Sequence, residues 1–334
     1  MANMNIFEQD AFSLFNMTQA VNDMQYIPSL VRNMGIYRSR GVTTTTIALE
    51  RKGTSIQLVQ TSPRGSAPEQ RIQDKRNIVP MQAVHLAKEA TVYADQVQGI
   101  RAFGTESETQ MVQSLVNQEI GNVRTEIDLT EEHMLLGGLQ GVVLDADGSV
   151  LYNFFDILGV DEPDAINFAL DDDSTKVRQK CTDVKRAMAT ALQAGGMQFT
   201  IGALAGDEFF DNLVNHPDVE ESYKYQDAQV NRTDYAFESF QYGGINFINY
   251  RGSDDGSVSI AADECRFFPM GVPGMFEVAY APADMMNTVN TIGLPRYAIP
   301  GRDPSGKDKY MSYEIQANPL PYCTRPQALL TGKA

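Results

Sequence analysis

The sequence predicts an α+β protein, and three observations lead to this prediction. A proline-free span from Met81 to Glu162 contains a long helical repeat of apolar residues. The second half of the chain instead contains several short apolar runs with strand composition. These runs do not alternate regularly with helices, which argues against a parallel βαβ architecture. With 334 residues, the chain can form one large domain or two packed domains.

The N-terminal region is predicted to be an arm followed by a β-hairpin. Residues 1–42 are mostly polar and show little periodicity, which is typical of an arm rather than a core. Two β-branched runs, Thr43–Ile47 and Thr54–Val59, then flank Lys52 and Gly53. A glycine turn between two such runs predicts a local hairpin.

A basic loop is expected after this hairpin. Residues 61–77 contain two prolines, one glycine and almost no apolar side chain, which predicts an exposed, extended segment. Eight basic and three acidic residues between Arg38 and Arg76 give this region an excess of +5, so the rest of the chain carries −21 of the net −16. Such an asymmetry is expected if the basic segment docks on a neighbouring copy of the protein, although a solvated loop has the same composition.

One long helix is predicted at about 105–139. Thr105 and Glu108 have capping-box spacing, and Gly137-Gly138 is the expected stop. Gly121 and the patch 128–130 are candidate bends. The apolar positions at helical spacing are Met111, Val112, Leu115, Val116, Ile120, Val123 and Ile127.

The second half is predicted to begin with an acidic connection, 161–173, and a helix from a Ser174 cap to Ala194 that stops at Gly195-Gly196. A strand at 197–205 and a helix from an Asp207 cap to Val214 follow, the latter burying Phe209, Phe210 and Leu213. A further helical turn is expected near 218–225. The later strand candidates are Phe237–Gln241, Ile245–Tyr250, Glu264–Phe268, Met275–Tyr280 and a terminal strand at Tyr313–Ala317.

Composition argues against several functional classes. A net charge of −16 disfavours a protein that grips nucleic acid through phosphates. No apolar run is long enough for a membrane span, and the N-terminus lacks the pattern of a secretory signal, so cytoplasmic synthesis is expected. Cys181, Cys265 and Cys323 lack metal-site spacing and are predicted to be buried thiols. The three histidines are scattered, and no catalytic triad, cofactor site or metal site is predicted.

One stretch does suggest an enzyme. "GVVLDADGSVLYN" (141–153) resembles the first motif of haloacid dehalogenase phosphatases, which would make Asp145 a nucleophile and Asp147 an acid/base. The spacing of Asp207 and Asp211 in "GDEFFD" is similar to the Mg²⁺ motif of that superfamily, with Lys180 or Lys185 as the phosphate-binding lysine.

The surrounding sequence favours a hairpin instead. A long helix precedes the motif, no second-motif strand follows it, and too few residues separate Gly148 from Glu208 for that fold. A tight type I′ turn centred on Asp147-Gly148 would set Leu144 opposite Leu151 and Val143 opposite Tyr152. We therefore predict a hairpin here, no catalytic residues and a protein that is not an enzyme.

The order of elements and several local motifs resemble the lambda-type major capsid proteins of tailed bacteriophages, which have the Hong Kong 97-type fold. "YEIQANPLPYCTRPQALLTGKA" (313–334) is similar to the final strand and tail of that family. "FEVAYAPADMMNTVNTIGLPRYAI" (276–299) is similar to the segment before it, and "GDEFFDNLVNHPDV" (206–219) to a helix with packed aromatics.

This resemblance implies a division of the chain. The implied regions are an N-terminal arm (1–42), a hairpin and extended loop (43–88), a peripheral domain (89–187) with a spine helix at about 105–139, an axial domain (188–300), and a C-terminal strand and tail (301–334) that return to the peripheral domain.

The resemblance also implies a function. The chain is expected to assemble through hexamers and pentamers into the icosahedral shell of a virion, built in the host cytoplasm around double-stranded DNA without sequence-specific binding. Scaffold and portal proteins are the expected assembly partners, and a decoration protein is an optional one; no membrane is involved. Arg64, Arg71, Lys75 and Arg76 are the candidate interface residues, facing acidic surface on a neighbouring subunit, such as 161–173. An encapsulin-like compartment shell and the phosphatase remain the alternatives.

Overall fold

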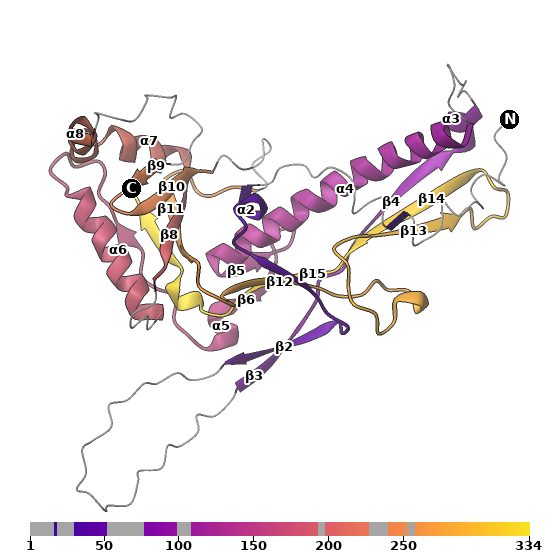
Figure 1. Cartoon of the computed structure of the whole chain (residues 1–334), viewed down its shortest axis with the longest axis horizontal. Helices are drawn as coiled ribbons and strands as arrows, with labels where there is room; N and C mark the ends of the chain where they lie inside the picture. The colour runs from indigo at the N-terminus through magenta and orange to yellow at the C-terminus, as the bar shows by residue number, and fades with distance from the viewer. Residues whose placement is uncertain are drawn as a thin grey trace, which may run out of the picture.

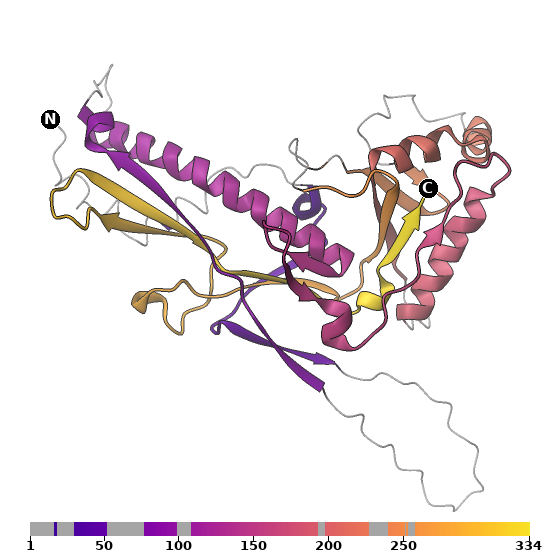
Figure 2. The ribbon, with the colours of Figure 1, turned by 180° about the vertical axis from the view of Figure 1, so that it is seen from behind.

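The computed structural model describes residues 17–18, 30–51, 77–98, 108–192, 198–226, 240–250, 252 and 258–334. Two sheets lie at opposite ends of a long helix, α4 (Glu108–Gln140), as both views show (Figure 1, Figure 2). Helices and separately paired sheets together give the α+β architecture that the sequence predicted.

The helix α4 has 33 residues and stays helical through both predicted bends, at Gly121 and at 128–130. Its predicted stop at Gly137-Gly138 is wrong, because the helix continues to Gln140 and the left-handed residue is Gly141, with φ of 87°. A Cβ on Gly137 would lie 2.7 Å from the carbonyl oxygen of Val142, and one on Gly138 would collide with the hydroxyl of Tyr37. These two glycines therefore allow close packing and do not end the helix.

A three-stranded antiparallel sheet packs along the first half of α4. Its strand order is β13 (Tyr297–Arg302), β14 (Tyr310–Ala317), β4 (Leu86–Tyr93). The short helix α3 (Ala94–Gln98) follows β4. The predicted apolar stripe of α4, including Val116 and Ile120, is buried against Tyr313 and Ile315 of β14. The expected spine helix thus packs through the face that its periodicity indicated.

A six-stranded mixed sheet lies beyond the other end of α4 (Figure 1). Its strand order is β7 (Ile166–Asn167), β16 (Leu330–Lys333), β11 (Glu264–Met270), β8 (Thr200–Ala205), β10 (Ile245–Asn249), β9 (Phe240–Tyr242). Four phenylalanines pack together on it, with Phe168 stacked on Phe267 and at a steep angle to Phe209, and Phe247 edge-on to Phe267. The predicted terminal strand at 313–317 is not the last, because β16 follows it and pairs inside this sheet.

Three helices lie beside the six-stranded sheet: α6 (Val177–Leu192), α7 (Asp207–Asn215) and α8 (Pro217–Gln226). α7 contacts β10 and β11 directly, while α6 and α8 contact each other and share the apolar core of the sheet. The predicted Asp207 cap is wrong, since the cap residue of α7 is Gly206 and Asp207 is the first helical residue. Phe209, Phe210 and Leu213 are buried as predicted. The expected stop of α6 at Gly195-Gly196 lies outside the described residues.

A smaller sheet connects the two larger ones. Its strand order is β1 (Arg38–Gly41), β12 (Phe276–Tyr280), β15 (Pro319–Cys323), with β1 parallel to β12. The helix α2 (Leu30–Asn33) precedes β1, and the turn η5 (Pro326–Ala328) follows β15. Its edge strand β15 contains Pro319 and Pro321, which lack the N–H group that a central strand needs.

The predicted local hairpin near 43–59 is wrong for its first run. β2 (Thr46–Arg51) pairs with β3 (Asn77–Gln82) in an antiparallel register that sets Arg51 opposite Asn77. The second run, Thr54–Val59, and the expected turn at Lys52-Gly53 lie outside the described residues. The long-range pairing brings both ends of the segment 52–76 together at one place.

The hairpin predicted at 141–153 is present as β5 (Val142–Leu144) and β6 (Val150–Asn153), followed by α5 (Phe154–Leu158). Val143 lies opposite Tyr152 as predicted, but Leu144 faces Val150 and not Leu151 because the register shifts there. The Gly148 amide donates to the Asp145 carbonyl at 3.0 Å, and within the turn Asp145–Ser149 only Gly148 has a positive φ, at 82°. The turn is therefore centred on Ala146-Asp147 with Gly148 as a G1 bulge, not on Asp147-Gly148.

Candidate functional site

The basic residues that the sequence marked as interface candidates are Arg64, Arg71, Lys75 and Arg76, and they lie outside the described residues. The structure does describe the proposed acidic counterpart at 161–173. Its exposed carboxylates are Asp161, Glu162, Asp164, Asp171, Asp172 and Asp173. Hydrogen bonds from the Ser174 hydroxyl and backbone N–H lower the pKa of Asp172, which favours its charged form.

The carboxylates of the phosphatase alternative belong to the hairpin turn. One side-chain oxygen of Asp145 accepts the Ala146 N–H at 2.7 Å, and one of Asp147 accepts the Ser149 N–H at 2.8 Å. The hydrogen bonds from Ser149 lower the pKa of the exposed Asp147 carboxyl. A carboxyl with a lowered pKa is a poor proton donor, which does not suit the acid/base role.

The remaining phosphatase candidates lie on other elements. Asp207 and Asp211 are on α7, while Lys180 and Lys185 are on α6, where the Lys180 ammonium donates to the Asn167 carbonyl at 2.8 Å. Over the described part of the chain, no group of three or more His, Cys, Asp or Glu side chains is arranged to hold a metal ion. Burial raises the pKa of the Cys181 and Cys323 thiols to about 12, so these sulfurs are held in the unreactive thiol form.

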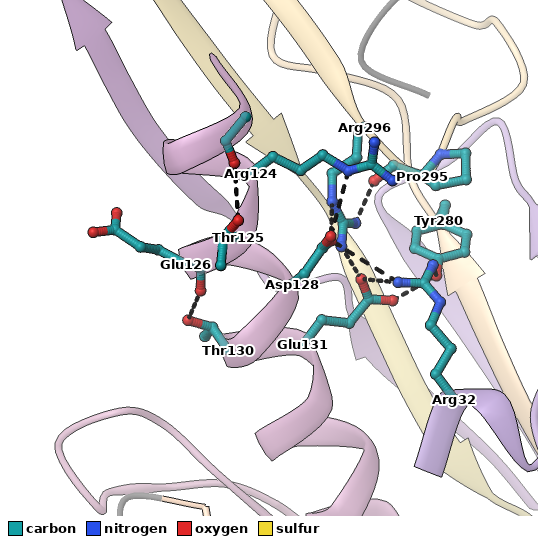
Figure 3. Close-up of polar contacts among 11 residues, drawn as sticks. Arg32, Arg124, Thr125, Glu126, Asp128, Thr130, Glu131, Tyr280, Pro295 and Arg296 are labelled. Carbon is teal, nitrogen blue, oxygen red and sulfur yellow. Dashed lines mark hydrogen bonds and ion pairs between the residues drawn. The ribbon is translucent and has the colours of Figure 1, made fainter. Parts of the chain in front are cut away.

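Several interacting charged side chains form a buried ionic cluster on α4 (Figure 3). Its members are Arg32, Arg124, Asp128, Glu131, Tyr280 and Arg296. It joins four parts of the chain that are far apart in sequence: α2, α4, the end of β12 and the residue before β13. Arg296 and Glu131 are only 2% and 1% exposed. Charges this deeply buried need partners, because the interior solvates an ion poorly.

Arg296 is at the centre of the ionic cluster. Its Nε donates to an Asp128 oxygen at 3.0 Å, and its terminal nitrogen donates to both Asp128 and Glu131. Its other terminal nitrogen donates to the Pro295 carbonyl at 2.7 Å. Burial opposes the charged form of Arg296, but the two carboxylates raise its pKa and keep it a cation.

Glu131 binds two further groups. An Arg32 nitrogen lies 3.3 Å from one of its oxygens, and the Tyr280 hydroxyl donates to the other at 2.5 Å. Burial alone would raise the pKa of Glu131, but Arg296, Arg32 and the Tyr280 hydrogen bond bring it below its usual value. Burial and the neighbouring Glu131 raise the pKa of Tyr280, so its hydroxyl remains a donor.

Asp128 and the neighbouring Glu132 each make one further contact. Arg124 Nε lies 3.3 Å from Asp128, four residues along α4. The next carboxylate on the helix, Glu132, accepts the Val31 N–H at 2.7 Å and is 4% exposed. The first residues of α2 are thereby fixed to the C-terminal half of α4.

Sequence reasoning missed this cluster, although a signal was present. Glu131 is four residues after Ile127 and so continues the stripe that is apolar at Val116, Ile120 and Val123. A carboxylate at a core position of a helix requires a buried cation. The stripe alone does not identify Arg296, which is 165 residues away.

Comparison with solved structures identifies the fold. A prophage capsid protein from Escherichia coli CFT073 superposes with a TM-score of 0.58 at 15% identity, over 96% of this chain and 98% of the other. The capsid of cyanophage Pam1 gives a TM-score of 0.53 at 11% identity, over 92% and 93% of the two chains. The fold is therefore the Hong Kong 97-type fold of phage capsid proteins.

Sequence comparison then gives the family. The family model described as phage major capsid protein E matches residues 13–334, so the chain belongs to that family. It is 25% identical to the major capsid protein of Salmonella phage Felix O1, over 98% of this chain and 97% of the relative. It is 26% identical to the major capsid protein of Pseudomonas phage KPP10, over 96% and 97%.

These matches support a virion shell component over the compartment shell and the phosphatase. In the part of the chain that the structure describes, no helix combines the length and apolarity that crossing a bilayer requires.

Proposed function

We propose that this phage major capsid protein assembles through hexamers and pentamers into an icosahedral shell around double-stranded DNA. It is a structural protein and carries out no reaction. Membership of the major capsid protein E family is the observation that carries this proposal. The net charge of −16 supports a shell that repels packaged DNA and leaves it free to slide. Scaffold and portal proteins would assist assembly, and a decoration protein is an optional outer partner.

In this proposal the chain is divided into regions with separate roles. The helix α4 and the sheet β13-β14-β4 would form the peripheral domain, in which α4 is the spine. The six-stranded sheet with α6, α7 and α8 would form the axial domain around the capsomer axis, so this domain would extend beyond the expected bounds 188–300 to include α6, β7 and β16. The C-terminal segment 301–334 would not return to the peripheral domain alone, because β14 pairs with β4 there while β16 pairs with β11 and β7 in the six-stranded sheet.

The segment 52–76 would reach over a neighbouring subunit. Its base is the pairing of β2 with β3, where Arg51 faces Asn77, so the segment leaves and rejoins the body at one point. Its basic residues Arg64, Arg71, Lys75 and Arg76 would meet the exposed carboxylates of 161–173 on the next copy. Opposite charges of this kind fix the register between subunits and speed their encounter.

Electron microscopy of the purified chain tests the shell, since closed shells or capsomer rings are expected and a uniform monomer would contradict it. The double variant Arg71→Glu/Arg76→Glu tests the docking. It should assemble poorly while its thermal unfolding matches that of the original protein, because the segment 61–77 has almost no apolar side chain to bury. Adding Asp171→Lys and Asp173→Lys should restore assembly. Normal assembly of the first variant would contradict the docking.

A further inference from the structure

The loop between β12 and β13, residues 281–296, exposes an unusual set of side chains, and we refer to it as the apolar loop. It includes the turn η4 (Met286–Thr288) and projects beyond the strands that it joins (Figure 1). Met286 is 90% exposed, Ile292 67%, Val289 58% and Leu294 43%. These four are half of the large apolar side chains exposed in the described part of the chain. Such clustering marks an interaction surface, whereas scattered exposed residues do not.

A groove lies beside the exposed side chains of the apolar loop. It has a volume of about 320 Å³, and most of its lining surface is apolar. The lining residues are Thr18, Asn287, Thr288, Thr291, Ile292, Leu294 and Tyr297. The loop therefore presents both an exposed apolar side chain, Met286, and a mostly apolar groove.

The apolar loop is held in one shape by its own hydrogen bonds. The Thr288 hydroxyl donates to the Ala283 carbonyl at 2.7 Å, and the Thr291 hydroxyl donates to the Thr288 carbonyl at 2.7 Å. The Gly293 N–H donates to the Val42 carbonyl at 2.9 Å, and Arg296 at the base belongs to the buried ionic cluster. A surface that is already ordered loses little conformational entropy when a partner binds.

The charge of the apolar loop indicates which partner it fits. Residues 285–295 contain no ionisable side chain, in a chain whose net charge is −16. Two copies of this chain repel each other, so contact is opposed least where charge is absent. Nucleic acid or an anionic membrane would instead need lysine and arginine at the contact.

We infer that the apolar loop is a contact surface between copies of this chain, in which Met286 of one copy packs into the groove beside Ile292 and Leu294 of another. This inference rests on the proposed shell-forming function and adds the surface that it uses. Projection and groove belong to the same loop, so symmetry-related copies can satisfy both with one kind of contact.

The first test introduces charge into this contact in the full-length chain. Met286→Glu/Ile292→Glu should raise the protein concentration needed for shell formation at least about tenfold, since it places carboxylates in an apolar contact. Thermal unfolding of the unassembled subunit should be unchanged, because both side chains are exposed. The matched variant Met286→Leu/Ile292→Val should assemble like the original. Normal shell formation by the glutamate variant would overturn the inference.

A second measurement does not depend on an assembly defect. The cysteine of Met286→Cys should react with maleimide in unassembled subunits and be protected in shells, while the buried Cys181, Cys265 and Cys323 stay unreactive in both. Equal labelling of the new cysteine in subunits and shells would overturn the inference. If the original chain forms no shells at all, the proposed function fails, which is a different result.

Discussion

The long helix α4 meets the rest of the molecule through two different kinds of contact along its length. Its first half packs Val116, Ile120 and Val123 against a sheet through apolar side chains. Its second half sets Asp128 and Glu131 against Arg32 and Arg296 from other segments, beside an apolar core that includes Leu135 and Leu139.

This difference shows how stability and specificity are divided along α4. Apolar contacts are non-directional, and volume-conserving changes are tolerated. Buried ion pairs add little net stability, because desolvation offsets their attraction, but removing one partner is severe. We therefore hypothesise that the ionic cluster sets which segments meet α4 and in what register, while the apolar half stabilises the contact.

The largest loss of stability is expected when a member of the ionic cluster on the second half of α4 is removed. Arg296→Ala should lower the free energy of unfolding of the unassembled subunit by about 3–5 kcal/mol, since Asp128 and Glu131 stay buried without their main partner. Urea unfolding measures this loss. The control is Lys88→Ala, which removes an exposed ion pair between Lys88 of β4, 53% exposed, and Glu126 of α4, 56% exposed. It should cost at most about 1 kcal/mol, and similar losses in both variants would contradict the distinction.

Acid should reduce the stabilisation that the ionic cluster provides and leave that of the apolar half of α4 unchanged. This loss of stability should be smaller than the loss caused by Arg296→Ala. The folded-state pKa of Glu131 is lowered, so its stabilisation is complete above its unfolded pKa of about 4.3 and is lost as the pH falls through the folded value. In Arg296→Ala, Arg296 no longer offsets the increase in the pKa of Glu131 that burial causes, so Glu131 protonates at a higher pH. The stability gap between the original protein and this variant should narrow as the pH falls from 7 toward 4. A constant gap in urea unfolding would argue against the assigned role of Glu131.

The smallest loss of stability is expected from a substitution in the first, apolar half of α4. Ile120→Val removes one methylene from a fully buried position and should cost about 0.5–1.5 kcal/mol. This loss should be the same at pH 7 and pH 4, because no titrating group is touched. A pH-dependent loss would show that the two halves of α4 are not independent.

The sequence predicted those parts of the fold that local patterns determine. The apolar period predicted the helix that the structure describes at Glu108–Gln140, while the predicted cap at Thr105 lies outside the described residues. The stop of α4 was missed because Gly137 and Gly138 meet Val142 and Tyr37. The turn at Ala146-Asp147 was placed one residue late, because a G1 bulge and a type I′ turn both use the same Asp-Gly pair.

Local sequence patterns did not predict which strands pair across long sequence separations. β2 finds its partner in β3 across the segment 52–76, and no local pattern distinguishes that from the adjacent run at 54–59. β15 was missed because prolines argue against a strand unless its edge position is known. The ionic cluster and the apolar loop depend on Arg296 meeting α4, which only the folded chain reveals.

The position of β16 has a consequence for how each subunit is made. Leu330–Lys333 lies between β7 and β11, so this sheet stays divided until residue 333 has left the ribosome. A chain released early retains β7 and β11 with no strand to bridge them. The β7 edge of this sheet therefore forms only after residues 330–333 have been synthesised.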